Sequence, residues 1–407
     1  MYLTGLIHRD RLFDVASRWL GDRLQPDDGR VVTEMFAFER VITGPSVRGF
    51  VGDLGHALKQ GTLLLERVFT KDAVRQAIVA AVTDPTPRMR ELVRRYHDLP
   101  EEFFPRTPVY MSLITRENGR VVAMVRRKRL RRIADKASRR VAEQLAGEIR
   151  AVGRDLAEHR AQLAGVSLDQ LYSPADVMDE EFAAAERIVA ERLRRLEITL
   201  DAERQRVDDV IGIKVVGDPS ELAQAEAYLE RRPGTVVRAR EVHDGSYSGT
   251  HLLVDLELPP ADAIVERMRG VDWSFAAGRG LDVDHLEAEF GDYVRTGARW
   301  FRVEVILTTF EDLLESEFGR SVHEVRILDQ RERTSYSGRI AQNASYIIEY
   351  LLRLAVSPTV TIDELPIKVW GRYLRDTVAH ALALLSNIDP REWLVDREEP
   401  GPIRLSP

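Results

Sequence analysis

The sequence predicts an α+β fold in which helices pack on a mixed β-sheet. Short apolar runs with many β-branched residues cluster at 108–127 and again at 210–309. Two of the later runs alternate apolar and polar residues, which is the period of a strand with one buried face. Charged segments with a helical period fill 137–206 and much of both ends of the chain. Together these patterns predict a sheet with helices before, between and after its strands.

Each strand is expected from its own pattern. VYMSLIT and GRVVAMVRR, joined by the turn-like residues 116–119, predict a β-hairpin, and VIGIKVV predicts a buried strand. HLLVDLEL and FRVEVILTT alternate, so that His251 and Asp255 share a face of one strand and Glu304 lies on the polar face of the other. A polar strand face that carries these residue types indicates a sheet that lines a ligand site.

The helical patterns divide the rest of the chain. DAVRQAIVAAV and RMRELVRRYHDL predict that residues 1–105 are mainly helical. Residues 137–206 predict two long amphipathic helices in a hairpin. ASYIIEYLLRL and YLRDTVAHALALL predict a helical region at 329–407 that ends in a Pro-rich tail.

Composition and charge limit the classes of function. A chain of 407 residues is long enough for two or three domains, and its net charge of −7 argues against a surface that binds nucleic acid throughout. The chain has no cysteine, which excludes disulfides, thiolate catalysis and Cys-ligated zinc and fits a reducing cytoplasm. No apolar run approaches the roughly 18 residues that span a membrane. We therefore expect a cytoplasmic protein with no membrane partner.

The stretch RRKRLRRIADK, residues 126–136, is the most basic part of the chain, with seven arginines and lysines. The whole chain has only six lysines, and two of them, Lys128 and Lys136, lie in this stretch. Taken alone, such a stretch is typical of a solvated helix face or a weak electrostatic patch. Because lysine acts as a compact charge on phosphate groups, the stretch also predicts a phosphate-binding segment.

Four local patterns follow one another along the chain and combine basic, acidic and aromatic residues. They are Arg126-x-Lys128-x-x-x-Arg132-Ile133-x-x-Lys136, then Asp209-x-x-Gly212-x-Lys214, then Tyr247-x-x-x-His251, and finally Glu304 between two valines with Glu317-x-Gly319-x-x-x-His323 after it. In this order they resemble the synthetase domain of the RelA/SpoT family, whose patterns are RxKxxxSIxxK, DxxGxR, GYxSxH, EIQIRT and ExGxxxH. Members of that family make the alarmones ppGpp and pppGpp.

The resemblance implies a nucleotidyltransferase-like synthetase core with a mixed sheet, formed by residues 106–136 and 207–328. Residues 137–206 would be a helical insertion, and 1–105 and 329–407 would flank the core. These helical regions offer surfaces for a homo-oligomer or a regulatory partner. The implied activity is ATP-dependent: a pyrophosphokinase transfers the β,γ-diphosphate of ATP to the 3′-hydroxyl of GTP or GDP.

The resemblance also assigns roles to individual residues. Asp209 and Glu304 would be catalytic and would hold Mg²⁺, or Mn²⁺ in its place, since both metals prefer oxygen ligands. Glu304 is also the candidate base for the 3′-hydroxyl. The residues expected to bind ATP are Arg126, Lys128, Arg132, Lys136 and Lys214. Those expected to bind the acceptor are Tyr247, which would stack on guanine, with His251 and His243 beside it.

Several positions depart from the family patterns and leave other functions open. Arg132 replaces a serine, and Lys214 replaces an arginine. Ile306 and Thr308 stand where EIQIRT has glutamine and arginine. The alternatives are therefore a toxin-type relative that modifies the 3′ end of tRNA, an enzyme that uses adenine nucleotides as acceptors, and an inactive sensor that binds nucleotides. A helical interaction protein with accidental matches is the fourth alternative, and it predicts that Asp209, Glu304 and Lys136 lie far apart.

Overall fold

The structure is a computed structural model that describes residues 1–58, 61–171, 175–245, 248–319, 338–357 and 360–385, together with the short strand at 403–405. Residues 175–179 and 403–405 are described by their backbone alone. Tyr247, His323 and most of the Pro-rich tail lie outside the described residues, so the predictions made for them stay predictions.

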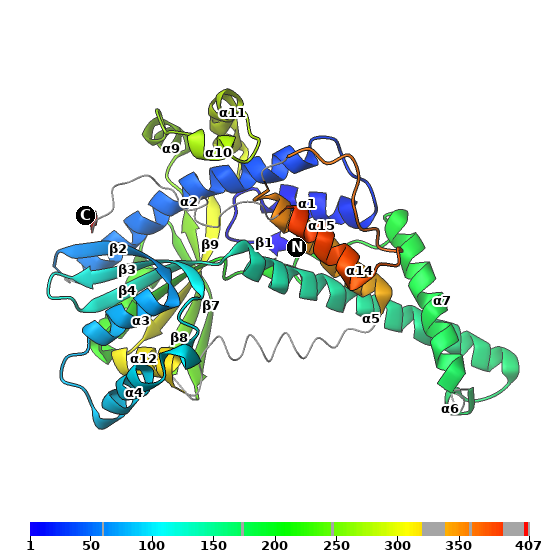
Figure 1. Ribbon diagram of the computed structural model, residues 1–407, viewed down its shortest axis with the longest axis horizontal. Helices are drawn as coiled ribbons and strands as arrows, with labels where there is room; N and C mark the ends of the chain where they lie inside the picture. Colours follow the sequence, from blue (N-terminus) through cyan, green and yellow to red (C-terminus); the bar gives the residue numbers. More distant parts are fainter. Residues whose placement is uncertain are drawn as a thin grey trace.

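One mixed sheet forms the centre of the fold, in the order β10-β2-β3-β4-β6-β9-β8-β7 (Figure 1). β6 and β9 run parallel, and the other neighbouring pairs run antiparallel. The strands are β2 (Leu63–Thr70), β3 (Pro108–Arg116), β4 (Val121–Arg127), β6 (Ile211–Val216), β7 (Thr235–Asp244), β8 (Ser248–Glu257), β9 (Trp300–Thr308) and β10 (Ile403–Leu405). A second, two-stranded sheet pairs β1 (Tyr2–Leu3) with β5 (Arg206–Val207). The prediction of helices packed on a mixed sheet is confirmed, and the nucleotidyltransferase-like core stays a prediction.

The strands expected from the sequence are present. β3 and β4 form the predicted antiparallel hairpin, and Gly119 in its turn has a φ of 81°, which suits glycine. Along β8, Leu252, Val254 and Leu256 are buried in the main hydrophobic core, as the alternation predicts. Their polar neighbours in sequence point to the opposite face of the sheet.

Three strands of the central sheet were not predicted: β2, β7 and the short β10, which lies in the expected Pro-rich tail. β2 lies within the segment expected to be mainly helical, and its sequence LLLERVFT begins with three leucines that suit a helix equally well. Thr70 ends the strand and accepts a hydrogen bond from the backbone N–H of Ala73, so it also caps the helix that follows. β7 is an edge strand with many charged and exposed residues, so its sequence has little of the alternation typical of a half-buried strand.

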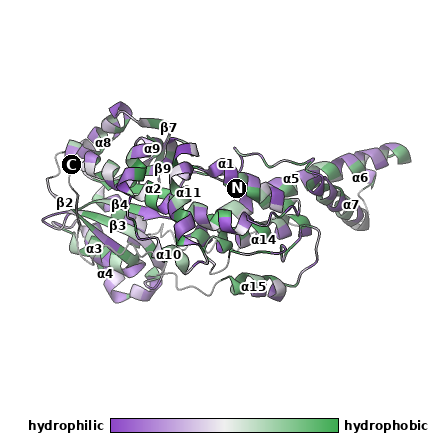
Figure 2. Cartoon of the chain, turned by 90° about the horizontal axis from the view of Figure 1, so that it is seen from above, coloured by the Kyte–Doolittle hydropathy of each residue, from purple (hydrophilic) through white to green (hydrophobic). Residues whose placement is uncertain are grey.

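The main core lies on one face of the sheet and along the helices that extend from it. The helices around this core are α1 (Arg9–Leu20), α2 (Asp28–Ala57), α5 (Leu130–Ala164), α7 (Ala175–Arg194), α8 (Pro219–Arg231), α9 (Ala261–Arg267), α10 (Ser274–Ala277), α11 (Val283–Thr296), α14 (Arg339–Leu354) and α15 (Arg375–Leu384). With the short α6 (Leu168–Leu171), α5 and α7 form an arm that projects from the sheet, and hydrophilic residues are frequent along it (Figures 1 and 2). None of the helices described combines the length and the apolar character needed to cross a bilayer.

A second, smaller core covers part of the opposite face. It joins α3 (Lys71–Ala80), α4 (Pro87–Asp98), the 3₁₀ turn Pro100–Phe103 and α12 (Phe310–Phe318) to residues of β2, β3, β4 and β6. Among the described residues, this core includes none from β8 or β9. On this face, β8 and β9 carry polar side chains instead, and these form the candidate site.

Candidate functional site

Strand pairing brings the basic stretch against Asp209. β4 and β6 are antiparallel neighbours, and the pairing continues past β4, where the backbone N–H of Lys128 donates to the carbonyl of Val210 at 2.9 Å. The ammonium groups of Lys128 and Lys136 both contact Oδ2 of Asp209, Lys136 at 2.5 Å. Lys136 comes from the second turn of α5, so residues 73 positions apart in sequence meet directly.

Gly212 forms the floor of the site. Arg126 and Glu304 are its cross-strand neighbours on β4 and β9. A Cβ atom at Gly212 would lie 3.7 Å from Oε2 of Glu304 and 3.9 Å from Nη2 of Arg126, so both charged groups lean over the glycine. These are ordinary contact distances. A small side chain would therefore fit at position 212. The glycine nevertheless leaves more room between Glu304 and Arg126.

Glu304 is held by a histidine and surrounded by cations. Nδ1 of His251 on β8 lies 3.4 Å from Oε1 of Glu304. Burial acts to raise the pKa of Glu304, but the interaction with His251 and the nearby charges of Arg126 and Lys128 lower that pKa to about 2. Glu304 is therefore ionised at neutral pH, which suits a metal ligand better than a resting general base.

Some buried polar atoms at the site have no partner. Oδ1 of Asp209 and Nε2 of His251 are buried without a hydrogen bond in the part of the chain that the structure describes. Burial, followed by the charges of Lys136 and Arg126, lowers the pKa of Lys128 well below its ordinary value. Because unpaired buried polar atoms are costly, these features are typical of a site that exchanges partners when a ligand binds.

An arginine that the sequence analysis did not single out braces the site. Arg302 lies two residues before Glu304 on the same face of β9, and its Nε and Nη2 bind Asp255 at 2.6 and 3.0 Å. Its Nη1 binds Asp208 at 3.1 Å, and its backbone N–H donates to the carbonyl of Thr4. The hydroxyl of Thr4 donates to Asp208 at 3.0 Å. Arg302 therefore joins the segment that carries Asp209 to two strands and to the N-terminus.

A second buried ionic cluster lies under α12, next to the site. Glu317 accepts a hydrogen bond from Lys71 at 2.9 Å and lies 3.5 Å from Nη2 of Arg75. Lys214 projects from β6 toward α12 and donates to the hydroxyl of Ser316 at 3.2 Å, and burial lowers its pKa to about 8. Glu317 belongs to the fourth sequence pattern, and its contacts give it a structural position between α3 and α12.

The remaining predicted residues lie at the rim or outside the described part. Arg132 is on α5 and binds Asp135 at 3.0 Å. The ring of His243 on β7 lies 4.1 Å from that of His251, centroid to centroid. Tyr247 is outside the described residues. The structure thus brings Arg126, Lys128, Lys136, Asp209, Glu304 and His251 together, with His243 adjacent, while Lys214 lies under α12.

The carboxylates of this site fit a hard divalent cation. Mg²⁺ usually takes one or two protein carboxylates and completes its coordination with water and substrate phosphates. Asp209 supplies an oxygen without a partner, and Glu304 supplies an ionised carboxylate. Lys128 and Lys136 both contact Asp209, and their charges also act on Glu304. No group of three or more acidic, His or Cys ligands occurs among the described residues, so the fit depends on ligands from a substrate.

Comparison of the chain with protein families, with curated proteins and with solved structures finds no match.

Proposed function

We propose that the protein is an ATP-dependent pyrophosphokinase, a divergent relative of the RelA/SpoT synthetases with a nucleotidyltransferase-like core. It would transfer the β,γ-diphosphate of ATP to the 3′-hydroxyl of a guanine nucleotide. The observation that carries the proposal is the meeting of Lys128, Lys136, Asp209 and Glu304 at the part of the sheet that the smaller core does not reach. These residues come from the separate sequence patterns on which the family resemblance rests, so an accidental match would not be expected to bring them together.

The basic residues would bind the triphosphate. Lys128 and Lys136 contact Asp209, and the side chain of Arg126 makes no hydrogen bond or ion pair among the described residues. Arg126 is therefore available to stack on adenine through its planar guanidinium. When ATP enters, the two lysines would turn from Asp209 to the phosphates and release the carboxylate.

Asp209 and Glu304 would then hold Mg²⁺. Bound there, Mg²⁺ would supply positive charge that stabilises the negative charge developing on the phosphates during transfer. Glu304 would act as the base only where Asp209 alone holds the metal, and the pKa of Glu304 would then rise as the lysines turn to the phosphates. The carboxylate would then be a stronger base for the 3′-hydroxyl proton, as the acceptor oxygen bonds to the β-phosphorus and AMP leaves.

The acceptor would bind on the side of β7 and β8. Nε2 of His251 is buried and unpartnered, and the adjacent ring of His243 is about a third exposed, with 37% of its side chain accessible. Two neighbouring imidazoles suit contact with the phosphates or ribose of a nucleotide. We propose guanine as the base, because Tyr247 matches the aromatic residue that stacks on guanine in the family.

The test is transfer of label from γ-³²P-ATP in the presence of Mg²⁺. GDP, GTP, AMP, ADP and bulk tRNA are offered in parallel to the wild type and to Glu304→Gln. Glu257→Gln is the matched control, since Glu257 lies on the neighbouring strand β8 in an ion pair with Arg299. Label is expected on GDP or GTP, with the wild type and Glu257→Gln equally active and Glu304→Gln inactive.

The other outcomes separate the alternatives. Label on tRNA alone would favour the toxin-type function, and label on AMP or ADP would identify an adenine-nucleotide acceptor. ATP binding without transfer to any acceptor would favour a nucleotide sensor. Absence of ATP binding would contradict the proposal.

A further inference from the structure

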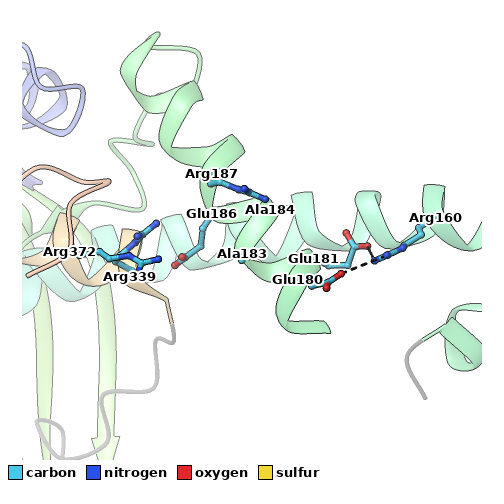
Figure 3. Close-up of a pocket in the computed structure, with 9 residues that line it drawn as sticks. All are labelled: Arg160, Glu180, Glu181, Ala183, Ala184, Glu186, Arg187, Arg339 and Arg372. Atoms are coloured by element: carbon cyan, nitrogen blue, oxygen red, sulfur yellow. Dashed lines mark hydrogen bonds and ion pairs between the residues drawn. The ribbon is translucent and has the colours of Figure 1, made fainter. Parts of the chain in front are cut away.

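A further charged cluster lies at the projecting arm, away from both the candidate site and the cluster under α12. It lines a pocket of about 680 Å³ between α5, α7, the start of α14 and the segment before α15 (Figure 3). Ala185 of α7, next to Glu186 in sequence, lies against Gly153 of α5, which is 17 residues from Lys136, or roughly 25 Å along a helix. The pocket is therefore separate from the candidate active site.

The two ends of the pocket differ in charge. At one end Arg160 is paired with two carboxylates, Glu181 at 2.8 Å and Glu180 at 3.7 Å (Figure 3). At the other end lie Arg187 and Arg339 together with Arg372. No side chain of these three makes a hydrogen bond or ion pair in the part of the chain that the structure describes. Nε of Arg339 is buried without a partner.

The carboxylate nearest the three arginines is engaged elsewhere. Glu186 is buried, and its Oε1 accepts a hydrogen bond from the backbone N–H of Ile340 in the first turn of α14 at 3.3 Å. Within the described residues, no ion pair joins Glu186 to Arg187, Arg339 or Arg372. This end of the pocket therefore carries more positive charge than its own carboxylate neutralises.

The segment that carries Arg372 is fixed rather than loosely attached. Asn343 of α14 donates to the carbonyls of Val369 at 2.8 Å and Gly371 at 2.9 Å. The guanidinium of Arg194 on α7 lies over the ring of Trp370, 4.7 Å from its centroid. The backbone that carries Arg372 is thus held beside the pocket by contacts with both neighbouring helices, and its exposed side chain can turn toward a ligand.

We propose that this pocket binds a small phosphate-bearing anion. Arginine presents a planar set of donors that matches phosphate oxygens, and three unpaired arginines around one space are the arrangement such a ligand requires. The volume lies in the range typical of small-molecule sites, so the ligand is a diphosphate or a nucleotide rather than a macromolecule. This inference depends on the pocket alone and holds whether or not the sheet site transfers pyrophosphate.

The experiment follows hydrogen–deuterium exchange of the whole chain during titration with inorganic phosphate, sodium pyrophosphate or GDP. Because the sheet site also carries phosphate-binding cations, exchange is read separately in peptides from 180–194 and 339–354 and in peptides from 126–136. The variant is Arg187→Gln with Arg372→Gln, since both side chains are exposed and their loss should not disturb folding. Arg150→Gln, an exposed arginine of α5 outside the pocket, is the matched control.

The expected result is protection of 180–194 and 339–354 by pyrophosphate, with an affinity roughly tenfold or more weaker in the double variant. Arg150→Gln should bind like the wild type, and Glu186→Gln should bind more tightly, because it removes the negative charge nearest the arginines. Equal protection by pyrophosphate and GDP would identify a site for phosphates alone, and tighter binding of GDP would identify a nucleotide site. Absence of protection in these peptides at millimolar ligand would overturn the proposal. An equal loss of affinity in Arg150→Gln would also overturn it, since only general electrostatic attraction would then be present.

Discussion

Glu304 and Glu317 are chemically similar but lie in different surroundings. Both are largely buried, with 17% and 9% of their side chains exposed, and cationic neighbours lower the pKa of each to about 2. Glu317 is enclosed under α12, where Lys71 and Arg75 bind it. Glu304 lies on the part of the sheet that the smaller core does not cover, next to buried atoms that lack partners.

The comparison separates a structural ion cluster from a candidate site. A lowered carboxylate pKa occurs in both, so it does not by itself indicate function. The unpartnered atoms distinguish the two places, because Oδ1 of Asp209 and Nε2 of His251 have capacity for a ligand. We therefore expect changes at Glu317 to reduce stability and changes at Glu304 to reduce activity.

The largest effect is expected for Glu317→Gln. The variant removes the buried carboxylate that Lys71 and Arg75 contact and that lies near Lys214, which should lower the free energy of unfolding by about 3–5 kcal/mol. Urea denaturation of the purified variant measures this change. Glu311→Gln on the same helix is the control and should cost less than about 1 kcal/mol. A Glu317→Gln protein as stable as the wild type would show that the cluster does not hold α12 to α3.

Glu304→Gln is expected to have the opposite profile. It should lower the rate of pyrophosphate transfer roughly a thousandfold, about 4 kcal/mol of transition-state stabilisation, because a neutral amide is a poor metal ligand and base. Its unfolding free energy should change much less than that of Glu317→Gln, since Asp209 still balances the nearby lysines. The measurement is single-turnover transfer together with urea denaturation. Equal losses of stability in the two variants would remove the distinction between the clusters.

Glu39 on α2 extends the comparison, because it is a buried carboxylate that no cation of the described residues contacts directly. Its Oε1 accepts hydrogen bonds from the backbone of Ile7 at 2.7 Å and from the hydroxyl of Tyr293 at 3.0 Å. Burial is the largest influence and raises the pKa of Glu39 to about 7. A carboxyl group whose pKa is higher in the folded state stabilises the fold when protonated. That contribution is complete below the unfolded pKa of about 4.5 and is lost as pH rises through about 7.

The measurement is the free energy of unfolding at several pH values between 4.5 and 7, compared with Glu39→Gln. The wild type should lose on the order of 3 kcal/mol relative to the variant across this range, since a shift of about 2.5 units corresponds to that energy. Burial lowers the pKa of His8, which acts in the opposite direction, and taking the difference from the variant removes that contribution. Glu304 and Glu317 titrate alike in wild type and variant, so the same difference removes their contribution as well. Parallel pH profiles of wild type and variant would contradict the assignment.

The sequence predicted the strands of the site better than it predicted the contacts between them. HLLVDLEL and FRVEVILTT alternate because one face of β8 and β9 packs on the main core, so the face that carries His251 and Glu304 was predictable. The parallel pairing of β6 with β9, which places Glu304 beside Gly212, is a long-range feature that no local pattern encodes. β2 was missed because its leucines suit helix and strand alike. β7 was missed because an exposed edge strand has little apolar alternation.

The sequence analysis did not identify Arg302, because its role depends on contacts with residues distant in sequence. FRVEVILTT places it on the same face as Glu304, but its partners Asp208 and Asp255 come from other segments, 94 and 47 residues away. The adjacent acidic residues Asp208 and Asp209 were the one local signal. Two neighbouring carboxylates can have different partners, and here an arginine binds Asp208 while lysines contact Asp209. Arg302 touches neither Asp209 nor Glu304 in the described contacts, so we assign it a positioning role.

Arg302→Lys should therefore have the smallest effect of the four. Lysine keeps the charge but not the fork that binds Asp255 through two nitrogens and Asp208 through a third, so the segment before β6 would be held less firmly. We expect a roughly tenfold loss of kcat, about 1.4 kcal/mol, with a raised Mg²⁺ concentration for half-maximal rate and little change in the KM for ATP. Arg299→Lys on the same chain segment, in an exposed pair with Glu257, is the matched control and should be unaffected. A rise in the KM for ATP at constant kcat would instead place Arg302 in substrate binding. The substrate site would then include Arg302 as well as Glu304, along the same face of β9. Buried ion pairs near Glu304 would then bind substrate, whereas those around Glu317 hold the fold together.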